Sequence, residues 1–367
     1  MTICRVVVIG AGVAGLACAL ACARAGAQVQ LLEARTVVAH VPAHVDVVPN
    51  MLRDFAKLGV AEACVRRGFA YSDLAVVDEH GDEAFRLLTK RLVGPQLPPA
   101  VGIALDDLLD LLASAALQAG VALHRGCAVQ VVETSTGRVV AEDGQVFDAD
   151  LVVLATGSES ALAQRLFGAM RLPAVHHAWW HTLLLRPQGL ERTTWMAGSA
   201  DRRLLLVPLG MSRAGVAVVG RIPSGEEANG GALTRMLAAW GALPRRIAAA
   251  IDPSQPVALR LASGALRSTP WHRDTVVCVG AAAHSIAPAF GHASAQAVDD
   301  AVVLGELLCA GIESSLLPEH FTERRVPRAR RLHALIERAT QWMVRPEPAM
   351  NLMRLADDFA TLVAEPA

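Results

Sequence analysis

The chain has 367 residues, which is enough for two or three structural units around a sizeable hydrophobic core. Hydrophobic residues make up 53% of it and charged residues 19%, which excludes an intrinsically disordered protein. The formal net charge of −1 provides no basic surface for a nucleic acid, so we expect no nucleic-acid partner.

The cysteines and the hydropathy indicate the cellular setting. Seven cysteines occur without a CxxC pair, which favours reduced thiols in a cytoplasmic protein. No cluster of His, Cys and Asp has the spacing of a zinc site, so we expect no metal. We expect neither a signal peptide nor a transmembrane segment, because no run reaches the roughly 20 apolar residues that span a bilayer. A mean hydropathy of +0.37 leaves peripheral membrane contact open. Both a monomer and a homodimer are compatible with this composition.

The N-terminal residues predict a βαβ unit. Residues 5–9 are a β-branched run, typical of a parallel strand buried on both faces. A glycine turn over residues 10–15 leads into an Ala- and Leu-rich helix over residues 13–25, which Gly26 ends. Residues 29–32 form the next strand, which closes with Glu33.

The turn of this unit carries the pattern GxGxxG at Gly10, Gly12 and Gly15. The first glycine permits the tight turn, the second lets the backbone approach a pyrophosphate, and the third allows close packing of helix on strand. Val13 and Ala14 open the helix, whose free N–H groups and partial positive charge attract phosphates. We therefore predict a dinucleotide site. The alternative is a glycine turn in a degenerate site that has lost its ligand.

The middle of the chain mixes both kinds of element. Helical spacing covers residues 45–58 and 105–119. Strand patterns cover residues 75–78, 83–88, 121–134 and 151–155, and a hairpin joins residues 138–141 to 146–147 around Asp143-Gly144.

The stretch from about residue 173 to residue 268 changes character. It predicts a helix over residues 233–240 and strands over residues 181–185, 204–207, 215–221 and 257–261, with Gly and Pro at the turns between them. We interpret it as an antiparallel sheet inserted in a parallel-sheet domain, to which the chain returns at Val276. Residues 328–345 predict a helix whose arginines form a solvated face.

The predicted fold class is therefore α/β, with a Rossmann-like domain, an inserted and mainly antiparallel sheet domain, and a C-terminal helix. The Rossmann-like domain takes residues 1–72, 101–172 and 271–327. The second domain, which we expect to bind the substrate, takes strands from residues 73–100 and its main sheet from residues 173–270. Residues 328–367 form a separate C-terminal helical segment.

Residues 276–301 give the most specific signal: a buried strand, a glycine turn, a Pro-containing loop and a helix. This segment resembles the second flavin-contacting motif of single-component (class A) FAD-dependent monooxygenases of the aromatic-hydroxylase type. Glu33-Ala34-Arg35, Pro49-Asn50 and Thr156-Gly157 also resemble stretches of that family, as does the Arg-rich helix over residues 323–335. The resemblance covers nearly the whole chain except residues 173–268.

The resemblance implies FAD as the cofactor and NAD(P)H as a transient electron donor. The chain has no second GxGxxG, which is expected because the family lacks a separate NAD(P)H domain. It implies that a flavin C4a-hydroperoxide transfers one oxygen atom from O₂ to an electron-rich ring, while the protein supplies orientation and a dry pocket. It assigns these positions to the cofactor site: Gly10, Gly12, Val13, Ala14, Gly15, Glu33, Ala34, Arg35, Thr156, Gly157, Gly280, Ala281, Pro288, Gly291, His292, Ala293 and Ser294.

Three positions depart from the family pattern. Ala281 replaces the Asp that binds the flavin ribityl chain, Thr156 replaces the Asp of a short Asp-Gly motif, and Leu105 stands where an Arg commonly contacts the cofactor. One charge-assisted hydrogen bond contributes roughly 1.5–3 kcal/mol, so the loss at Ala281 corresponds to about tenfold to a hundredfold in affinity. We expect FAD binding that is retained but weaker.

The loop Gly291-His292-Ala293 replaces the usual Gly-Gln-Gly. A protonated His292 would stabilise anionic reduced flavin near its N1 and C2 carbonyl; the alternative is a loop residue whose backbone alone matters. Asp299 and Asp300 match a Glu-Asp pair of the family, for which we expect a structural role.

The substrate would lie between the flavin ring and the inserted sheet, and the apolar composition favours an aromatic or apolar small molecule. No catalytic base emerges from the sequence. Two alternatives to a monooxygenase stay open: a repurposed or non-catalytic homologue with weak or no FAD binding, and a flavin oxidoreductase that does not hydroxylate. Candidate pocket residues are Trp180, His181, Arg221, Pro288 and Phe290.

Overall fold

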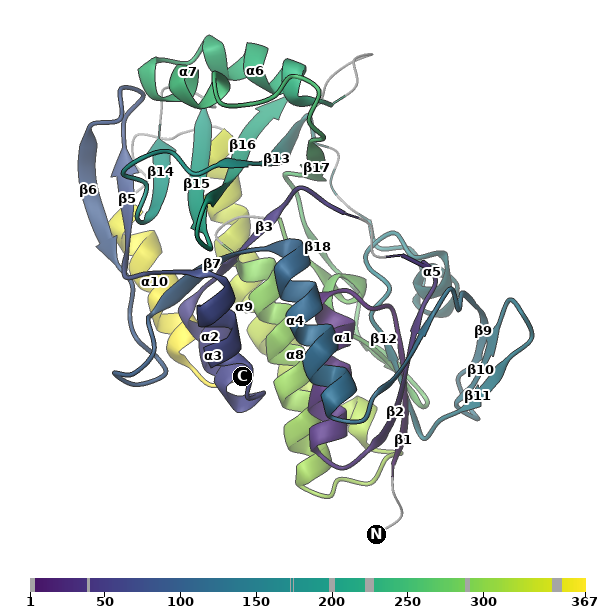
Figure 1. Cartoon of the computed structure of the whole chain (residues 1–367). Coiled ribbons are helices and arrows are strands. Elements are labelled where there is room, and N and C mark those ends of the chain that lie inside the picture. The colour runs from purple at the N-terminus through teal and green to yellow at the C-terminus, as the bar shows by residue number, and fades with distance from the viewer. Residues whose placement is uncertain are drawn as a thin grey trace.

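The computed structural model describes residues 4–37, 40–171, 173, 175–197, 202–221, 228–287, 291–344 and 352–367. A layered α/β unit carries the N-terminus, and a large, mainly antiparallel sheet lies above it in Figure 1. This arrangement confirms the predicted α/β fold class with an additional antiparallel sheet.

A six-stranded sheet forms the centre of the α/β unit. Its inner strands are parallel, and only the edge strand β19 is antiparallel to its neighbour. All four residues of β12 and four of the five residues of β1 are buried, and each of these has a branched apolar side chain. Burial on both faces is expected for parallel strands that are covered on both sides. In spatial order the strands are β19 (His272–Arg273), β20 (Val276–Cys278), β12 (Leu151–Leu154), β1 (Arg5–Ile9), β2 (Gln28–Glu33) and β8 (Ala122–Arg125).

Five helices build the layer beside this sheet. α1 (Val13–Arg24) packs against α4 (Leu105–Gln118) and α8 (His292–Cys309), and α8 also contacts α2 (Pro49–Lys57) and α9 (Leu317–Val344). Small side chains allow the close approach of α1 and α8, since a Cβ on Gly305 would lie 3.3 Å from the Ala21 Cβ. The starts of α1 and α8 also lie close together, because a Cβ on Gly280 would lie 2.6 Å from the Ala14 Cβ and 3.7 Å from the Ala297 Cβ.

The large sheet has seven strands. All neighbours are antiparallel except the parallel pair β14 and β5. In spatial order they are β17 (Ala258–Leu261), β13 (His177–Leu185), β16 (Arg213–Arg221), β15 (Arg203–Leu209), β14 (Thr193–Ala197), β5 (Asp73–Val77) and β6 (Glu83–Leu88).

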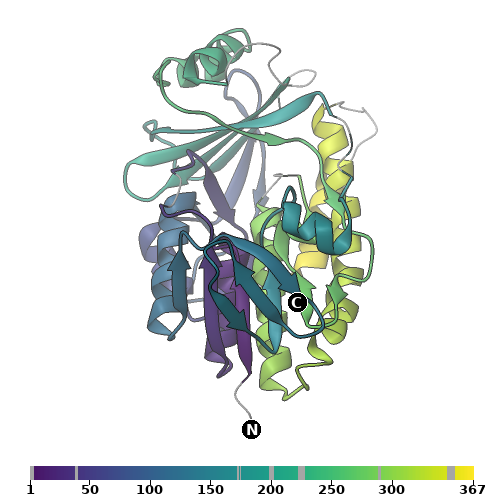
Figure 2. The same cartoon turned by 90° about the vertical axis from the view of Figure 1, so that its right-hand side faces the viewer.

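The two faces of the large sheet pack against different layers. One face is covered by α6 (Gly230–Ala238) and α7 (Ala242–Ala248), which cap the molecule in Figures 1 and 2. The other face packs against α9 and α10 (Leu352–Ala364). The small sheet of β3 (His44–Val47), β7 (Ala100–Ala104) and β4 (Phe69–Tyr71) contacts β15 and so joins the two units.

The remaining elements are short connections. They are α3 (Ala61–Arg67), α5 (Ala161–Phe167), a 3₁₀ turn over Gly280–Ala282, the hairpin sheet of β9 (Val129–Glu133), β10 (Arg138–Ala141) and β11 (Val146–Asp148), and the pair β18 (Ala265–Leu266) and β21 (His284–Ser285). No helix within the described ranges is long and apolar enough to cross a membrane.

The largest differences from the sequence-based prediction are at the starts of two helices. The predicted helix over residues 45–58 begins only at Pro49, because residues 44–47 form β3. Proline suits the first turn of a helix, where its missing N–H costs no hydrogen bond. The C-terminal helix starts at Leu317 rather than near residue 328, and Pro327 lies inside it.

The predicted solvated arginine face of the last long helix is wrong at Arg328. Its Nε donates to the Asp299 carboxylate at 3.0 Å, and one turn earlier the Arg325 Nε donates to Asp300 at 2.7 Å. Both arginines are buried, whereas Arg330 further along α9 is exposed. Arg328 also donates to the Leu362 carbonyl, so this ion-pair cluster fixes the end of α10.

Candidate active site

The glycine turn after β1 has the geometry of a pyrophosphate-binding turn. Gly10 has a φ of +102°, and a Cβ there would lie 2.6 Å from the Ala155 carbonyl oxygen. A Cβ on Gly15 would lie 1.7 Å from the Gly10 carbonyl oxygen, so helix and turn can pack this closely only without a side chain. A Cβ on Gly12 would meet nothing within 4 Å, which leaves that side of the turn open to a ligand.

The start of α1 and the end of β2 complete the predicted nucleotide-binding edge. Gly12 caps α1 without a side-chain hydrogen bond, so the first N–H groups of the helix, at Val13 and Ala14, face the open side of the turn. Glu33 accepts hydrogen bonds from the Ala11 N–H at 2.8 Å and the Arg35 N–H at 3.0 Å. These bonds hold the carboxylate in place, and each oxygen keeps a lone pair for a ribose hydroxyl.

The ends of β12 and β20 lie beside this turn. A Cβ on Gly10 would lie 3.4 Å from the Thr156 Cα, and a Cβ on Gly280 would lie 2.6 Å from the Ala14 Cβ. The Oγ1 of Thr156 is buried and has no hydrogen-bond partner among the described residues, so it can serve a ligand as donor. Ala281 is exposed and offers no polar atom at the position where the family has Asp.

The start of α8 forms the other end of the predicted cofactor site. Gly291 caps this helix in the left-handed region with a φ of +73°, and a Cβ there would lie 2.3 Å from the Asp46 carbonyl oxygen. No side chain caps the helix, so the N–H groups of its first turn, which includes Ala293 and Ser294, are available to a ligand. Pro288 and Phe290, two predicted site residues, lie outside the described residues.

The His292 side chain is buried and packs against α10. Its ring stacks on Phe359 of α10, with centroids 4.9 Å apart and an interplanar angle of 5°. Burial lowers the pKa of His292 to about 4, although Asp299 acts in the opposite direction. The imidazole is therefore neutral at pH 7 in this arrangement, which supports the backbone role of the loop rather than a protonated partner for flavin.

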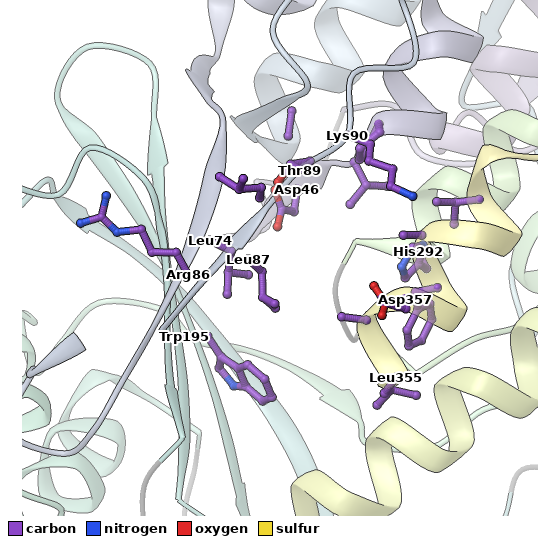
Figure 3. Close-up of a pocket in the computed structure, with 18 of the residues that line it drawn as sticks. Asp46, Leu74, Arg86, Leu87, Thr89, Lys90, Trp195, His292, Leu355 and Asp357 are labelled. Atoms are coloured by element: carbon purple, nitrogen blue, oxygen red, sulfur yellow. The ribbon is translucent and has the colours of Figure 1, made fainter. Parts of the chain in front are cut away.

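A cavity of about 460 Å³ lies between the large sheet and the C-terminal helices. In Figure 3, Leu74, Leu87 and Trp195 line it on the sheet side, while His292 and Leu355 line it on the helix side. Most of the lining is apolar, as in typical small-molecule sites. The residues that line the cavity are Asp46, Val48, Pro49, Tyr71, Leu74, Phe85, Arg86, Leu87, Leu88, Thr89, Lys90, Leu92, Ala100, Trp195, Leu205, His292, Ala339, Leu355, Ala356, Asp357, Phe359, Ala360 and Val363.

Asp46 and Tyr71 form a buried polar pair in the wall of this cavity. The Tyr71 hydroxyl donates a hydrogen bond to Asp46 Oδ1, and each residue is 7% exposed. Burial raises the pKa of Asp46 to about 6, while the bond from Tyr71 lowers it. Sequence reasoning missed both residues, although Tyr71 is the single tyrosine of the chain.

The predicted pocket residues of the large sheet do not gather in this cavity. Trp180 is wrong as a pocket residue, because it points into the core beneath α6 and α7. Neighbours along a strand face opposite sides, so His181 points towards β3, where its ring lies 5.7 Å from that of His44. Arg221 is exposed at the end of β16. Neither His181 nor Arg221 lines the cavity.

The described residues fit a dinucleotide better than a metal. Gly10, Gly12 and Gly15 form a turn with open space on one side, two helices start there without side-chain caps, and Glu33 is fixed in place. Within the described part of the chain, no group of three or more His, Cys, Asp or Glu side chains could hold a metal ion.

Comparisons with known proteins agree with this geometry. The chain is 26% identical over 354 residues to the putative FAD-dependent monooxygenase YetM of Bacillus subtilis, covering 94% of this chain and 95% of that protein. It is 25% identical over 350 residues to the FAD-dependent urate hydroxylase of Klebsiella oxytoca, covering 89% of this chain and 87% of that protein.

The fold is similar to that of Klebsiella pneumoniae HpxO, whose structure was solved with FAD and uric acid. The TM-score is 0.82 at 21% identity, covering 98% of this chain and 92% of that one. Residues 3–335 match the family model described as "FAD binding domain". Because that match spans most of the 367 residues, the chain belongs to the FAD-binding monooxygenase family, and FAD is the cofactor that the family binds.

Proposed function

We propose that this protein is a FAD-dependent monooxygenase that hydroxylates an aromatic or apolar small molecule, with NAD(P)H as electron donor and O₂ as the oxygen source. Bound FAD would supply the electron transfer and the oxygen activation. Relatives named as a monooxygenase and a urate hydroxylase support this reaction class.

One observation carries the proposal: the cofactor edge and the apolar cavity meet at the start of α8. A Cβ on Gly291 would touch the Asp46 carbonyl oxygen, and the Asp46 side chain lines the cavity. His292 follows Gly291 directly and lines the cavity as well. A substrate in the cavity would thus lie next to the loop that the family uses to hold its flavin.

Different residues of the chain would bind the cofactor and the substrate. Gly12, Glu33 and the start of α1 would bind the nucleotide part, and the start of α8 would orient the ring end of the cofactor. Leu74, Trp195 and other apolar cavity residues would exclude water and hold the substrate.

Reconstitution with FAD tests the proposal. The purified protein is incubated with excess FAD, desalted, and its absorbance is recorded at the flavin bands. Oxidation of NADH and of NADPH is then followed with and without a panel of aromatic compounds, together with oxygen uptake, hydrogen peroxide release and product mass. We expect bound flavin and a product heavier by one oxygen atom.

Two results would refute this function in favour of the alternatives. Absence of flavin uptake from excess FAD would indicate a repurposed, non-catalytic homologue, for which the missing carboxylates at Thr156 and Ala281 would account. Flavin uptake with NAD(P)H oxidation, but with all oxygen released as hydrogen peroxide for every compound, would indicate an oxidoreductase that does not hydroxylate.

A further inference from the structure

The cavity has an exposed rim and a buried polar pair. Leu88, Lys90 and Asp357, which lie on β6, the loop after it and α10, are exposed where they line it. Asp46 and Tyr71 also line it and are buried. A ligand would therefore place one end against a carboxylate and extend the other end between β6 and α10.

The other walls of the cavity are mostly apolar. Leu74, Phe85 and Leu87 come from β5 and β6, and Leu355 and Phe359 come from α10. The wall formed by α10 is held in place at its end, because arginines from α2 and α9 donate to backbone carbonyls of residues 362–367. The apolar channel is thus part of the folded structure.

The volume exceeds what a single aromatic ring needs. A cavity of about 150 Å³ lined by apolar side chains is large enough to bind benzene. The cavity described here, at about 460 Å³, has roughly three times that volume. One ring against Asp46 would leave the part between Leu87 and Leu355 to a further apolar group.

Two polar atoms of the lining can still bind a ligand: His292 Nδ1, which is buried without a hydrogen-bond partner among the described residues, and Asp46 Oδ2. Tyr71 donates to Asp46 Oδ1, and Asp46 Oδ2 has no hydrogen-bond partner among the described residues. A carboxylate oxygen is an acceptor only, so it selects a ligand with an O–H or N–H group and disfavours a ligand with a carboxylate.

We propose that the substrate is an aromatic ring with an O–H or N–H donor and an apolar tail, in which Asp46 accepts the donor and the tail occupies the channel between β6 and α10. This inference rests on the proposed function, because it names the substrate class of that same site. Asp46 determines specificity for the ring by accepting its donor group. Leu87 and Leu355 determine specificity for the tail by lining the channel.

Calorimetric binding of a homologous series to the FAD-loaded protein tests the inference. The probes are 4-n-alkylphenols from phenol to 4-heptylphenol, with the 4-n-alkylanisoles, which lack the O–H, as matched controls. We expect the Kd to fall about fourfold for each methylene buried in the channel, and each anisole to bind at least tenfold more weakly than its phenol. Equal Kd values along the series would overturn the inference.

Two variants connect these effects to their residues. Asp46→Asn keeps an acceptor for Tyr71, and we expect it to reduce the preference for phenol over anisole to less than threefold. Leu87→Trp fills the channel, and we expect it to abolish the dependence on chain length. Leu185→Trp is the matched control on the same sheet, because Leu185 is 78% exposed and does not line the cavity. An unchanged preference in Asp46→Asn would contradict the assignment of Asp46.

Binding and turnover fail in different ways, so the two proposals are separable. Product formation with Kd values that do not depend on alkyl chain length would refute the proposed substrate class but not the proposed monooxygenase activity. Chain-length-dependent binding with oxygen released only as hydrogen peroxide would support the substrate class and refute hydroxylation.

Discussion

Restoring a carboxylate at position 281 should strengthen FAD binding without changing the fold. Ala281 is exposed in the 3₁₀ turn after β20, so an Asp side chain there needs no burial and meets no packed neighbour. The turn contacts the start of α1, since a Cβ on Gly280 would lie 2.6 Å from the Ala14 Cβ. The partial positive charge of that helix end also favours an added carboxylate.

The expected size of the effect follows from one charge-assisted hydrogen bond. Such a bond contributes about 1.5–3 kcal/mol, which corresponds to about tenfold to a hundredfold in Kd. We therefore expect Ala281→Asp to lower the Kd for FAD by at least tenfold. Since the site is exposed, the free energy of unfolding without FAD should change by less than about 0.5 kcal/mol.

Titration of the flavin-free protein with FAD, followed by quenching of flavin fluorescence, measures this Kd. Ala250→Asp is the control, because Ala250 is exposed after α7 and distant in sequence from every cofactor residue. An unchanged or raised Kd in Ala281→Asp, with unfolding as in the parent, would refute the idea that the missing carboxylate weakens the site.

Three further predictions concern the turn, the buried charges and pH. Gly15→Ala should lower the free energy of unfolding by about 1–3 kcal/mol in urea titrations, because its Cβ would lie 1.7 Å from a carbonyl oxygen; Gly12→Ala should leave it unchanged and weaken FAD binding instead. Arg325→Met should cost about 3–5 kcal/mol in the same titrations, since it leaves the buried Asp300 without its ion pair. The pKa of Asp46 is raised to about 6 from 3.8, so the folded state binds the extra proton and stability falls as pH rises from about 4 to 6. Asp46→Asn should remove up to about 3 kcal/mol of that fall, measured as the free energy of unfolding against pH.

Local patterns predicted the parts of the site that local backbone geometry creates. Gly10, Gly12 and Gly15 follow from sterics within one βαβ unit, and Glu33 follows from the length of that unit. The same reasoning failed at residues 45–48, where the short segment Val-Asp-Val-Val before a proline fits a strand as well as a helix. Residues 44–47 form a strand because they pair with β7, which lies more than 50 residues away in the sequence.

The cavity could not be predicted because its polar pair is made by tertiary contacts. Asp46 and Tyr71 are 25 residues apart and come together because β3 and β4 both pair with β7. The prediction of Trp180 as a pocket residue failed for a related reason. The sequence placed Trp180 correctly in the sheet, but the face to which its side chain points depends on strand register. A one-residue step along β13 separates the core beneath α6 from the face towards β3.

The altered flavin motif keeps its scaffold although one polar side chain is missing. Asp300 accepts hydrogen bonds from the Gly280 N–H and the Arg325 Nε, each at 2.7 Å, and its Oδ2 lies 2.7 Å from the His284 Nε2. Asp300 and Arg325 are fully buried, so the charges are stable only while the turn keeps this shape. The backbone of the predicted flavin-contacting turn is therefore held by Asp300, independently of the side chain at Ala281. We therefore expect substitution at position 281 to affect FAD affinity alone, and loss of the Asp300 carboxylate to affect both affinity and folding.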